Sequence, residues 1–387
     1  MSREARYLAG GYFWYFATVG LFVPYWPLFL AKRGFDGMEI GLAMGVFAAL
    51  RVVGPPAYAH WADVTGRRLQ LLKVASLAAL GCALSFYWLR SLWAILLLLA
   101  AYSALWNGVM SVYDAHVLER LQADSGRYGL LRLWGSVGFI VFASSAGWAL
   151  DRAGIEVLPL ALAAAIGITW LTIRGLGTGT GTPTGQPRSP LGPVLADRRV
   201  KVFLVVAFLM VASHGAYYNF FTLYLRRLGY GGAAIGLLWA WAVIAEIGVF
   251  LLARRLLARY PLRSLTVFAL TAAALRWLVL ALWADIAPIV FAAQTLHLAS
   301  FGVFHLCSVS IAQVLFPRGA AARGQALHGS VGYGLGGMAG ALVSGWLWRE
   351  VSPEAAFLAG ALTALGAAAL AAAGLRDLPS WSAPKGQ

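Results

Sequence analysis

The sequence predicts an all-α membrane protein, with twelve transmembrane helices in two pseudo-symmetric six-helix bundles. Hydrophobic residues make up 60% of the 387 residues and charged residues only 12%, against about 25% charged residues in an average soluble chain. The apolar residues gather in long runs, and part of the sequence occurs twice. Such a composition suits lipid as the solvent.

Twelve apolar runs are close to or above the roughly 20 residues that a helix needs to cross a bilayer. The first run is too long for a secretory signal and has no small-residue cleavage site, so we expect it to be retained. The expected spans are residues 7–31, 39–62, 70–89, 92–118, 129–151, 155–173, 200–225, 233–253, 264–284, 287–316, 324–348 and 354–375.

An internal repeat supports two tandem halves. The matched segments are 20–51 with 215–246 at an offset of 195, and 135–138 with 329–332 at an offset of 194. The longer match ends on a reversal of charge, because Arg51 corresponds to Glu246. Tandem halves of this kind are typical of secondary transporters that rock around a central site.

A connector rich in Gly, Thr and Pro follows the sixth span and lacks apolar periodicity, as flexible linkers do. We therefore expect an N-terminal bundle over 1–174, a cytoplasmic linker over 175–199, a C-terminal bundle over 200–375 and a cytoplasmic tail over 376–387. This division coincides with the break between the two repeats.

The basic residues predict the orientation, since cytoplasmic loops are enriched in Lys and Arg. With the N-terminus in the cytoplasm, 20 of the 30 basic residues are cytoplasmic. The charge of +15 is then a topology signal, and we expect no nucleic-acid partner. Cys82 and Cys307 lie in apolar segments, which predicts no disulfide and no metal site. The expected location is a bacterial inner membrane, with both termini cytoplasmic.

Five charged side chains, Arg51, Asp114, Arg132, Glu246 and Arg276, lie well inside the expected spans, where a charge is costly and usually faces a cavity or a partner. Asp114 and Arg132 are at compatible depths and can pair, either as a structural bridge or as a substrate-binding pair. Glu246 and Arg276 are related in the same way. With Arg51, three arginines stand against two acids. A substrate carboxylate would neutralise the surplus charge.

Aromatic side chains crowd the first and seventh spans, either for packing or to enclose the apolar part of a substrate. Those assigned to the substrate site are Tyr15, Phe22, Trp26, Tyr217 and Tyr218.

Among the six histidines, His297 is the strongest candidate for proton coupling, because Gln294 shares its helix and Arg276 lies on the preceding one. Histidine can change protonation near neutral pH, and so can a buried Glu246. We assign proton coupling to these two residues with Arg276. The chain has no P-loop pattern, so direct use of ATP is not expected.

Asp63-Val-Thr-Gly66-Arg67-Arg68 follows the second span and resembles the loop signature of the major facilitator superfamily. The resemblance implies the major facilitator fold and a cytoplasmic gate made by Asp63, Gly66, Arg67 and Arg68. Two positions depart from the usual pattern: Ala59 stands where Gly is usual, and Val64 where a basic residue is usual.

Within the superfamily, the chain resembles the proton-coupled branch of lactose permease, nucleoside permeases and the 3-phenylpropionic acid transporter. Asp114 and Arg132-Leu-Trp-Gly-Ser-Val-Gly138 are similar to the acid–arginine pair that binds sugar in lactose permease. Arg276 and Thr295-Leu-His297 are similar to its proton-coupling network. Ser300 stands where lactose permease has a carboxylate, so the resemblance leaves the proton to Glu246 or another group. The likeness to the 3-phenylpropionic acid transporter covers nearly the whole chain.

The sequence therefore predicts proton symport of a small organic acid, such as an aromatic monocarboxylate, by alternating access. Arg51 or Arg132 would bind the carboxylate, Asp114 would orient Arg132, and Glu246 would carry the proton. The alternatives are a sugar or nucleoside proton symporter, a drug/proton efflux transporter and a transport-inactive receptor. An enzyme is disfavoured because no nucleophile–base motif appears. We expect a monomer without a cofactor, whose partners are the substrate, the proton and the bilayer.

Overall fold

The computed structural model describes residues 2–122, 124–176, 192–316, 320–376 and 378, and within these ranges it contains helices and no strand. The first helices are α1 (Arg3–Lys32), α2 (Gly37–Thr65), α3 (Arg68–Ser85), α4 (Leu92–Arg120), α5 (Ser125–Ala153), the short η1 (Ile155–Val157) and α6 (Leu158–Arg174). They are followed by α7 (Gly192–Ala196), α8 (Arg198–Ser213), α9 (Gly215–Arg227), α10 (Gly232–Arg259), α11 (Leu262–Trp283), α12 (Ala287–Thr295), η2 (Leu298–Val303), α13 (Phe304–Leu315), α14 (Ala321–Gly329), η4 (Ser330–Gly336), α15 (Gly337–Glu350) and α16 (Pro353–Gly374). Most of the expected linker and tail lies outside the described residues.

Eleven helical stretches of the described chain are long and apolar enough to cross a membrane. They correspond to the expected spans except 324–348. That stretch is also helical throughout, but it consists of α14, the π-helical η4 and α15 in direct succession. The all-helical prediction is confirmed, whereas the sequence did not indicate the two π-helical segments, η2 and η4.

The internal repeat is visible in the backbone at the end of its first helix. Gly34 and Gly229, which correspond at the offset of 195, have φ of +91° and +87°, a conformation that favours glycine. In both halves the amide after this glycine donates back to a carbonyl five residues earlier, from Phe35 to Leu30 at 3.2 Å and from Tyr230 to Leu225 at 3.0 Å. The repeated glycine therefore ends both helices in the same way.

Contacts between Cα atoms divide the chain into two compact units: the first unit is Met1–Gly185 with Tyr218–Ala240, and the second unit is Gln186–Tyr217 with Trp241–Gln387. The expected bundle bounds stay a prediction. Most of α9 and the start of α10 belong to the first unit.

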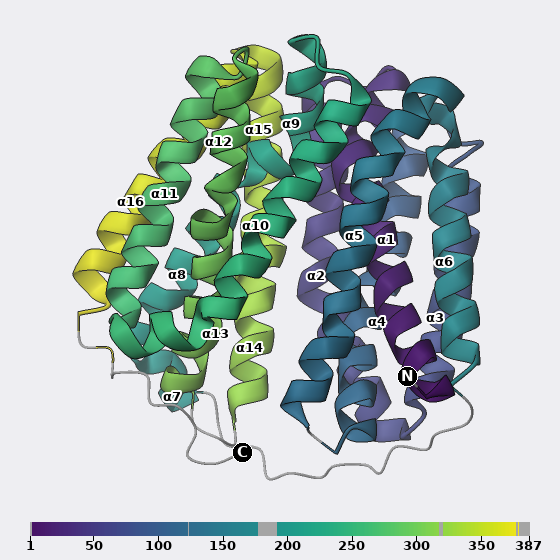
Figure 1. The fold of residues 1–387 in the computed structure, drawn as a ribbon, viewed down its shortest axis with the longest axis horizontal. Coiled ribbons are helices and arrows are strands. Elements are labelled where there is room, and N and C mark those ends of the chain that lie inside the picture. Colours follow the sequence, from purple (N-terminus) through teal and green to yellow (C-terminus); the bar gives the residue numbers. More distant parts are fainter. Residues whose placement is uncertain (1, 123, 177–191, 317–319, 377, 379–387) are drawn as a thin grey trace. The chain divides into compact units, whose positions relative to one another are not determined.

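Within the first unit, α1 packs against α5 and α6, α2 against α4, and α3 against α4 and α6 (Figure 1). Glycines allow α1 and α5 to approach closely. A Cβ on Gly20 would overlap the carbonyl of Phe139, and one on Gly138 would overlap the carbonyl of Phe13. Small residues at such crossings are typical of membrane bundles.

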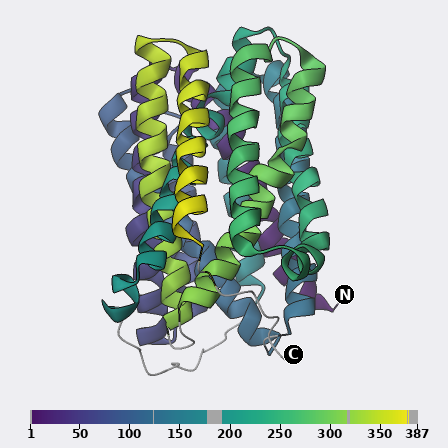
Figure 2. The same ribbon diagram turned by 90° about the vertical axis from the view of Figure 1, so that its left-hand side faces the viewer.

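Within the second unit, α16 packs against α8, α11 and α15. Figure 2 shows the yellow α16 beside the lime α15. The π-helical η4 packs on α8, where a Cβ on Gly336 would overlap the carbonyl of Phe208. The glycines of this segment therefore permit direct backbone contact.

Candidate functional site

Three charged or titratable side chains from different elements form a connected line in the second unit. Arg276 comes from α11, His297 precedes η2, and Glu246 lies on α10. Nη1 of Arg276 is 2.8 Å from Nδ1 of His297, and Nε2 of His297 is 3.6 Å from Oε2 of Glu246. His297 therefore lies between the arginine and the acid, the two residues with which it was grouped for proton coupling.

The direction of the hydrogen bond decides where the proton of His297 sits. A guanidinium only donates, so Nδ1 of His297 accepts from Arg276. A neutral ring then carries its hydrogen on Nε2, which points to Glu246. A doubly protonated ring would lose the contact, because both of its nitrogens would donate. The carboxylate of Glu246 is therefore the member of this line that can gain a proton without breaking it.

Arg276 is fully buried, and several neighbours other than an acid hold it. It donates to the amide oxygen of Gln294 and, at 3.4 Å, to the hydroxyl of Ser300. Its Cζ lies 4.2 Å from the ring centre of Tyr217 and 4.7 Å from that of Trp277. Charged hydrogen bonds and aromatic faces offset the cost of burying a cation.

The backbone around this line is unusual. The π-helical η2 begins directly after His297, and π-helical turns inside longer helices are frequent at functional sites. Gly302 on η2 faces Glu246, since a Cβ there would stand 3.3 Å from Cγ of Glu246. This glycine leaves room for the acid beside the histidine.

In the first unit, two tyrosine hydroxyls hold Asp114. Tyr12 of α1 donates to Oδ1 at 2.6 Å, and Tyr128 of α5 donates to the same oxygen at 3.0 Å. Among the described residues, Asp114 forms no ion pair with Arg132, so the expected direct pair is not formed. Tyr12 contacts both groups, with its hydroxyl on Oδ1 of Asp114 and its ring beside Arg132.

Arg132 lies on aromatic rings instead. Its Cζ is 4.2 Å from the ring centre of Phe16 and 5.6 Å from that of Tyr12. Gly135, one turn further along α5, provides the space, because a Cβ there would approach Nη1 of Arg132 to 2.9 Å. The half-buried guanidinium thus keeps hydrogen-bond donors for another partner.

Arg51 is also half-buried and is held by a polar relay. Its Nε donates to Oδ1 of Asn107 at 3.2 Å, and the amide of Asn107 donates to Ser103 at 2.7 Å. Ser103 in turn donates to the carbonyl of Phe47. The guanidinium also lies 5.2 Å from the ring centre of Phe47.

The predicted aromatic residues differ in their surroundings. Tyr15 stacks on Trp106 at 4.8 Å, whereas Phe22 and Trp26 stack on each other at 5.1 Å in the interior of the first unit. Tyr217 lies under Arg276, and Tyr218 is half-buried. Their assignment to a substrate site stays a prediction.

The predicted gate segment lies at the end of α2. Gly66 is the C-cap of this helix with φ of +66°, which explains a glycine at this place. Arg68 forms an ion pair with Glu119 at 2.7 Å, and Arg67 is exposed. The side chain of Asp63 lies outside the described part of the chain.

The structure adds residues that the sequence analysis did not assign to the site. Tyr12, Tyr128 and Asn107 contact the predicted charges, and Gln294 contacts Arg276. Helical spacing offers a signal for two of them. Tyr128 precedes Arg132 by four residues and Asn107 precedes Asp114 by seven, so each pair shares a helix face.

The model of the family described as MFS_1 like family matches residues 6–359. The chain belongs to this family of major facilitator transporters. It is therefore a multi-pass integral membrane protein that transports small molecules, and not an enzyme.

The curated relatives are bacterial. One is named as a probable 3-phenylpropionic acid transporter of Escherichia coli (strain K12) and is 27% identical over 312 residues, covering 79% of this chain and 82% of that protein. A maltose permease of Geobacillus stearothermophilus is 27% identical over 357 residues, covering 90% of this chain and 88% of the permease. These two relatives differ in their named substrates.

Solved structures show the same fold. The nucleoside transporter NupG aligns with a TM-score of 0.82 at 17% identity, over 97% of this chain and 100% of that chain. A bacterial homolog of the human lysosomal transporter Spinster aligns with a TM-score of 0.70 at 15% identity, over 99% of this chain and 100% of that chain. The predicted major facilitator fold is thereby confirmed.

Proposed function

We propose that this transporter is a proton symporter for a small monocarboxylate with an aromatic or apolar body. The observation that carries the proposal is the line from Arg276 through His297 to Glu246. In this line Arg276 donates to His297, and Nε2 of His297 faces Glu246, whose side chain is 15% exposed. An intramembrane acid with a histidine neighbour is the kind of group that proton-coupled transporters use as a relay.

The first unit supplies the features that suit an anionic substrate. Asp114 is already satisfied by two tyrosine hydroxyls, and Arg132 rests on aromatic rings rather than on an acid. A carboxylate can therefore take a bidentate contact with Arg132 without displacing Asp114. The rings of Phe16 and Tyr12 beside that guanidinium suit an aromatic body next to the carboxylate.

Coupling requires that the proton and the substrate bind in the same conformational cycle. In this proposal Glu246 takes up the proton from outside, and the substrate anion binds Arg132 or Arg51. The loaded transporter then changes the side from which the site is open. The proton and the substrate are released to the cytoplasm of a bacterial cell. The named substrate of the Escherichia coli relative supports an aromatic acid.

Counterflow in proteoliposomes tests the substrate class. Vesicles loaded with one compound are diluted into radiolabelled 3-phenylpropionate, maltose or uridine, and the transient uptake of label is measured. We expect counterflow with 3-phenylpropionate and other monocarboxylates. Counterflow with only the neutral compounds would contradict the proposal.

A neutral sugar or nucleoside is the second candidate. The observation that favours it is Asp114 with its two tyrosine hydroxyls, because acids and hydroxyl groups together bind sugar hydroxyls by hydrogen bonds. The names of two similar proteins, a maltose permease and the nucleoside transporter NupG, support this candidate. An Arg132→Gln variant separates the two, since loss of the positive charge impairs a carboxylate far more than a neutral sugar.

A further inference from the structure

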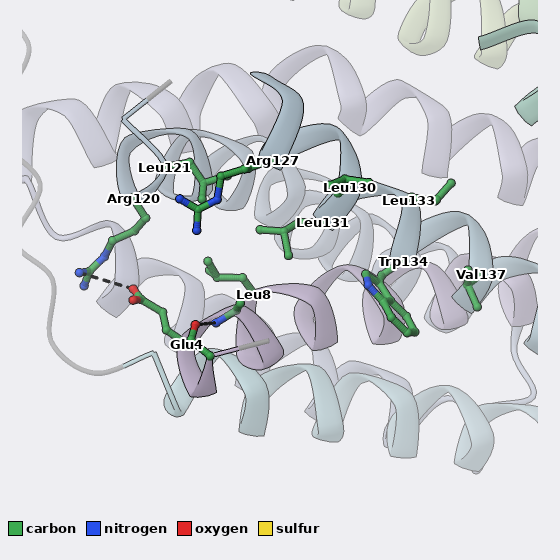
Figure 3. A pocket seen from close by; sticks show the side chains of 12 residues that line it. Glu4, Leu8, Arg120, Leu121, Arg127, Leu130, Leu131, Leu133, Trp134 and Val137 are labelled. Carbon is green, nitrogen blue, oxygen red and sulfur yellow. Dashed lines mark hydrogen bonds and ion pairs between the residues drawn. The ribbon is translucent and has the colours of Figure 1, made fainter. Parts of the chain in front are cut away.

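A groove lies in the first unit at the end where the chain begins. It has a volume of about 630 Å³ and is lined by the start of α1, the end of α4 and the start of α5. Figure 3 shows Glu4, Arg120 and Arg127 toward one end and Trp134 and Val137 toward the other. The groove is therefore divided along its length into a charged part and an apolar part.

The charged part has an excess of positive charge. Arg120 and Arg127 line it together with one acid, Glu4. The ion pair between Arg120 and Glu4 is 3.6 Å long, and the side chains are 39% and 54% exposed. Such an exposed pair contributes little stability, so an anion can replace Glu4 as the partner of Arg120. Among the described residues, no acid pairs with the guanidinium of Arg127.

The helix termini add to this attraction. Both α1 and α5 begin at the groove, and the N-terminal end of a helix carries a partial positive charge. The side chains of Ser2 and Asp124 already cap the two helices, by accepting from Ala5 and from Arg127. The free positive charge of the groove is consequently carried by the two arginines.

The apolar part extends away from the helix ends along α5. From Arg127 to Val137 the helix rises about 15 Å at 1.5 Å per residue, a large part of the roughly 30 Å hydrocarbon core of a bilayer. Leu8 is buried at its base, while Trp134 is 42% exposed. An exposed tryptophan offers a broad apolar surface against which an acyl chain can pack.

We propose that this groove binds one anionic phospholipid, with its phosphate on Arg120 and Arg127 and an acyl chain along Trp134 and Val137. The arrangement matches such a lipid part by part: cations lie where the helices end, and an apolar channel runs from them along α5. Basic pockets between transmembrane helices bind anionic headgroups by the same physics. The inference rests on the membrane location of the chain and is independent of the substrate proposed above.

Native mass spectrometry of the full-length protein in detergent tests the proposal. The protein is titrated with phosphatidylglycerol or with phosphatidylcholine of identical acyl chains, and the retained lipid is counted. We expect at least a severalfold preference for one phosphatidylglycerol. An Arg120→Gln/Arg127→Gln variant should lose this preference, and Val137→Trp should weaken retention of the lipid by filling the apolar part.

Arg152→Gln is the matched control, because Arg152 is an exposed arginine at the opposite end of α5. It should keep the preference. Melting temperatures of all variants show that they remain folded. Equal retention of the two lipids by the unaltered protein would overturn the proposal, and so would a preference that survives in the double variant. Full displacement of the lipid by soluble sn-glycerol 3-phosphate would overturn it too, since it would show a site for the phosphate alone.

Discussion

At the scale of single residues, the contacts of His297 distinguish the roles of Arg276, His297 and Glu246, which the sequence analysis assigned together to proton coupling. Arg276 can only donate, so its contact at 2.8 Å makes Nδ1 of His297 an acceptor. The ring then presents Nε2 to Glu246 at 3.6 Å. Of the three, Glu246 is the group left to exchange a proton in the proposed mechanism.

Glu246→Gln should therefore separate transport from coupling. Glutamine keeps the shape and an oxygen that can accept from Nε2 of the histidine, but it cannot take up a proton. We therefore expect uptake driven by a pH gradient to fall to the level without a gradient. Counterflow should continue, because it needs no net proton movement. Glu350→Gln is the control, since Glu350 is an exposed residue paired with Arg349. Unchanged gradient-driven uptake by Glu246→Gln would remove Glu246 from the mechanism.

Tyr12→Phe tests the support of Asp114. The change removes a hydrogen bond of 2.6 Å but leaves the ring that lies beside Arg132. Hydrogen bonds between membrane helices contribute about 0.6 kcal/mol on average and at most about 1.7 kcal/mol. We expect a roughly threefold weaker substrate affinity, and at most a roughly eighteenfold weaker one. Tyr128→Phe, which removes the contact of 3.0 Å, should have a smaller effect. Calorimetric titration measures the substrate affinity of the two variants and of the unaltered protein. Equal affinities would show that the tyrosine contacts of Asp114 do not affect binding.

At the scale of elements, glycine decides how closely helices approach. Gly20 and Gly138 bring α1 and α5 into backbone contact, and this contact sets Tyr12 and Phe16 beside Arg132. Substrate binding at Arg132 thus depends on the packing of two helices. The membrane supplies no hydrophobic force between helices, which makes such close packing more important than in a soluble bundle.

Gly138→Ala should destabilise the first unit, because its Cβ would overlap the carbonyl of Phe13. Overpacking of this kind costs about 1–3 kcal/mol. Gly129→Ala on the same helix is the matched control, since nothing lies within 4 Å of the added methyl group. The control should be neutral or slightly stabilising, because alanine favours a helix. Melting temperatures in detergent give the comparison, and equal values for the two variants would contradict this account of the α1–α5 contact.

A second element-scale feature is the attachment of Tyr218–Ala240 to the first unit. Asp151 at the end of α5 accepts from Arg226 and, at 2.7 Å, from the amide of Gly232. The hydroxyl of Tyr25 donates to the carbonyl of Ala143 nearby. One carboxylate therefore holds the connection between α9 and α10.

Asp151→Asn should loosen this segment, because an amide cannot replace both charged contacts. Hydrogen exchange followed by mass spectrometry should show faster exchange over 228–236 and little change elsewhere in the first unit. Asp285→Asn, at an exposed position after α11, serves as the control. If exchange over 228–236 is the same in both variants, the carboxylate of Asp151 does not hold the segment.

At the scale of the whole molecule, the duplicated chain carries different chemistry in its two halves. The helix-ending glycines Gly34 and Gly229 are the same in conformation. The corresponding positions Arg51 and Glu246 are opposite in charge and differ in their partners, an amide relay for one and a histidine for the other. Duplication preserved the backbone while the site residues diverged.

Arg51→Gln should accordingly affect substrate binding and spare coupling. We expect a higher KM for an anionic substrate, by about tenfold if one charged contact is lost, with an unchanged ratio of protons to substrate. Simultaneous measurement of substrate uptake and of pH in proteoliposomes gives both quantities. An altered ratio with an unchanged KM would reverse the assigned roles.

The sequence alone determined the all-helical membrane fold, the superfamily and most of the helix positions. These depend on composition and periodicity, because a helix in lipid must be apolar along its length and satisfies its own backbone. The identities of Arg51, Asp114, Arg132, Glu246, Arg276 and His297 were equally evident, since a charge within a span stands out in any apolar sequence.

Only the tertiary structure decided which of these groups touch. Depth along two helices suggested that Asp114 pairs with Arg132, but the rotation of α1 places Tyr12 beside both and gives Asp114 two hydroxyl partners. Likewise, the order Arg276–His297–Glu246 and the π-helical η2 behind it arise from packing among helices distant in sequence. Periodicity reports which face of a helix is apolar, whereas a contact between polar side chains depends on the crossing of helices and on the rotamers that their neighbours allow.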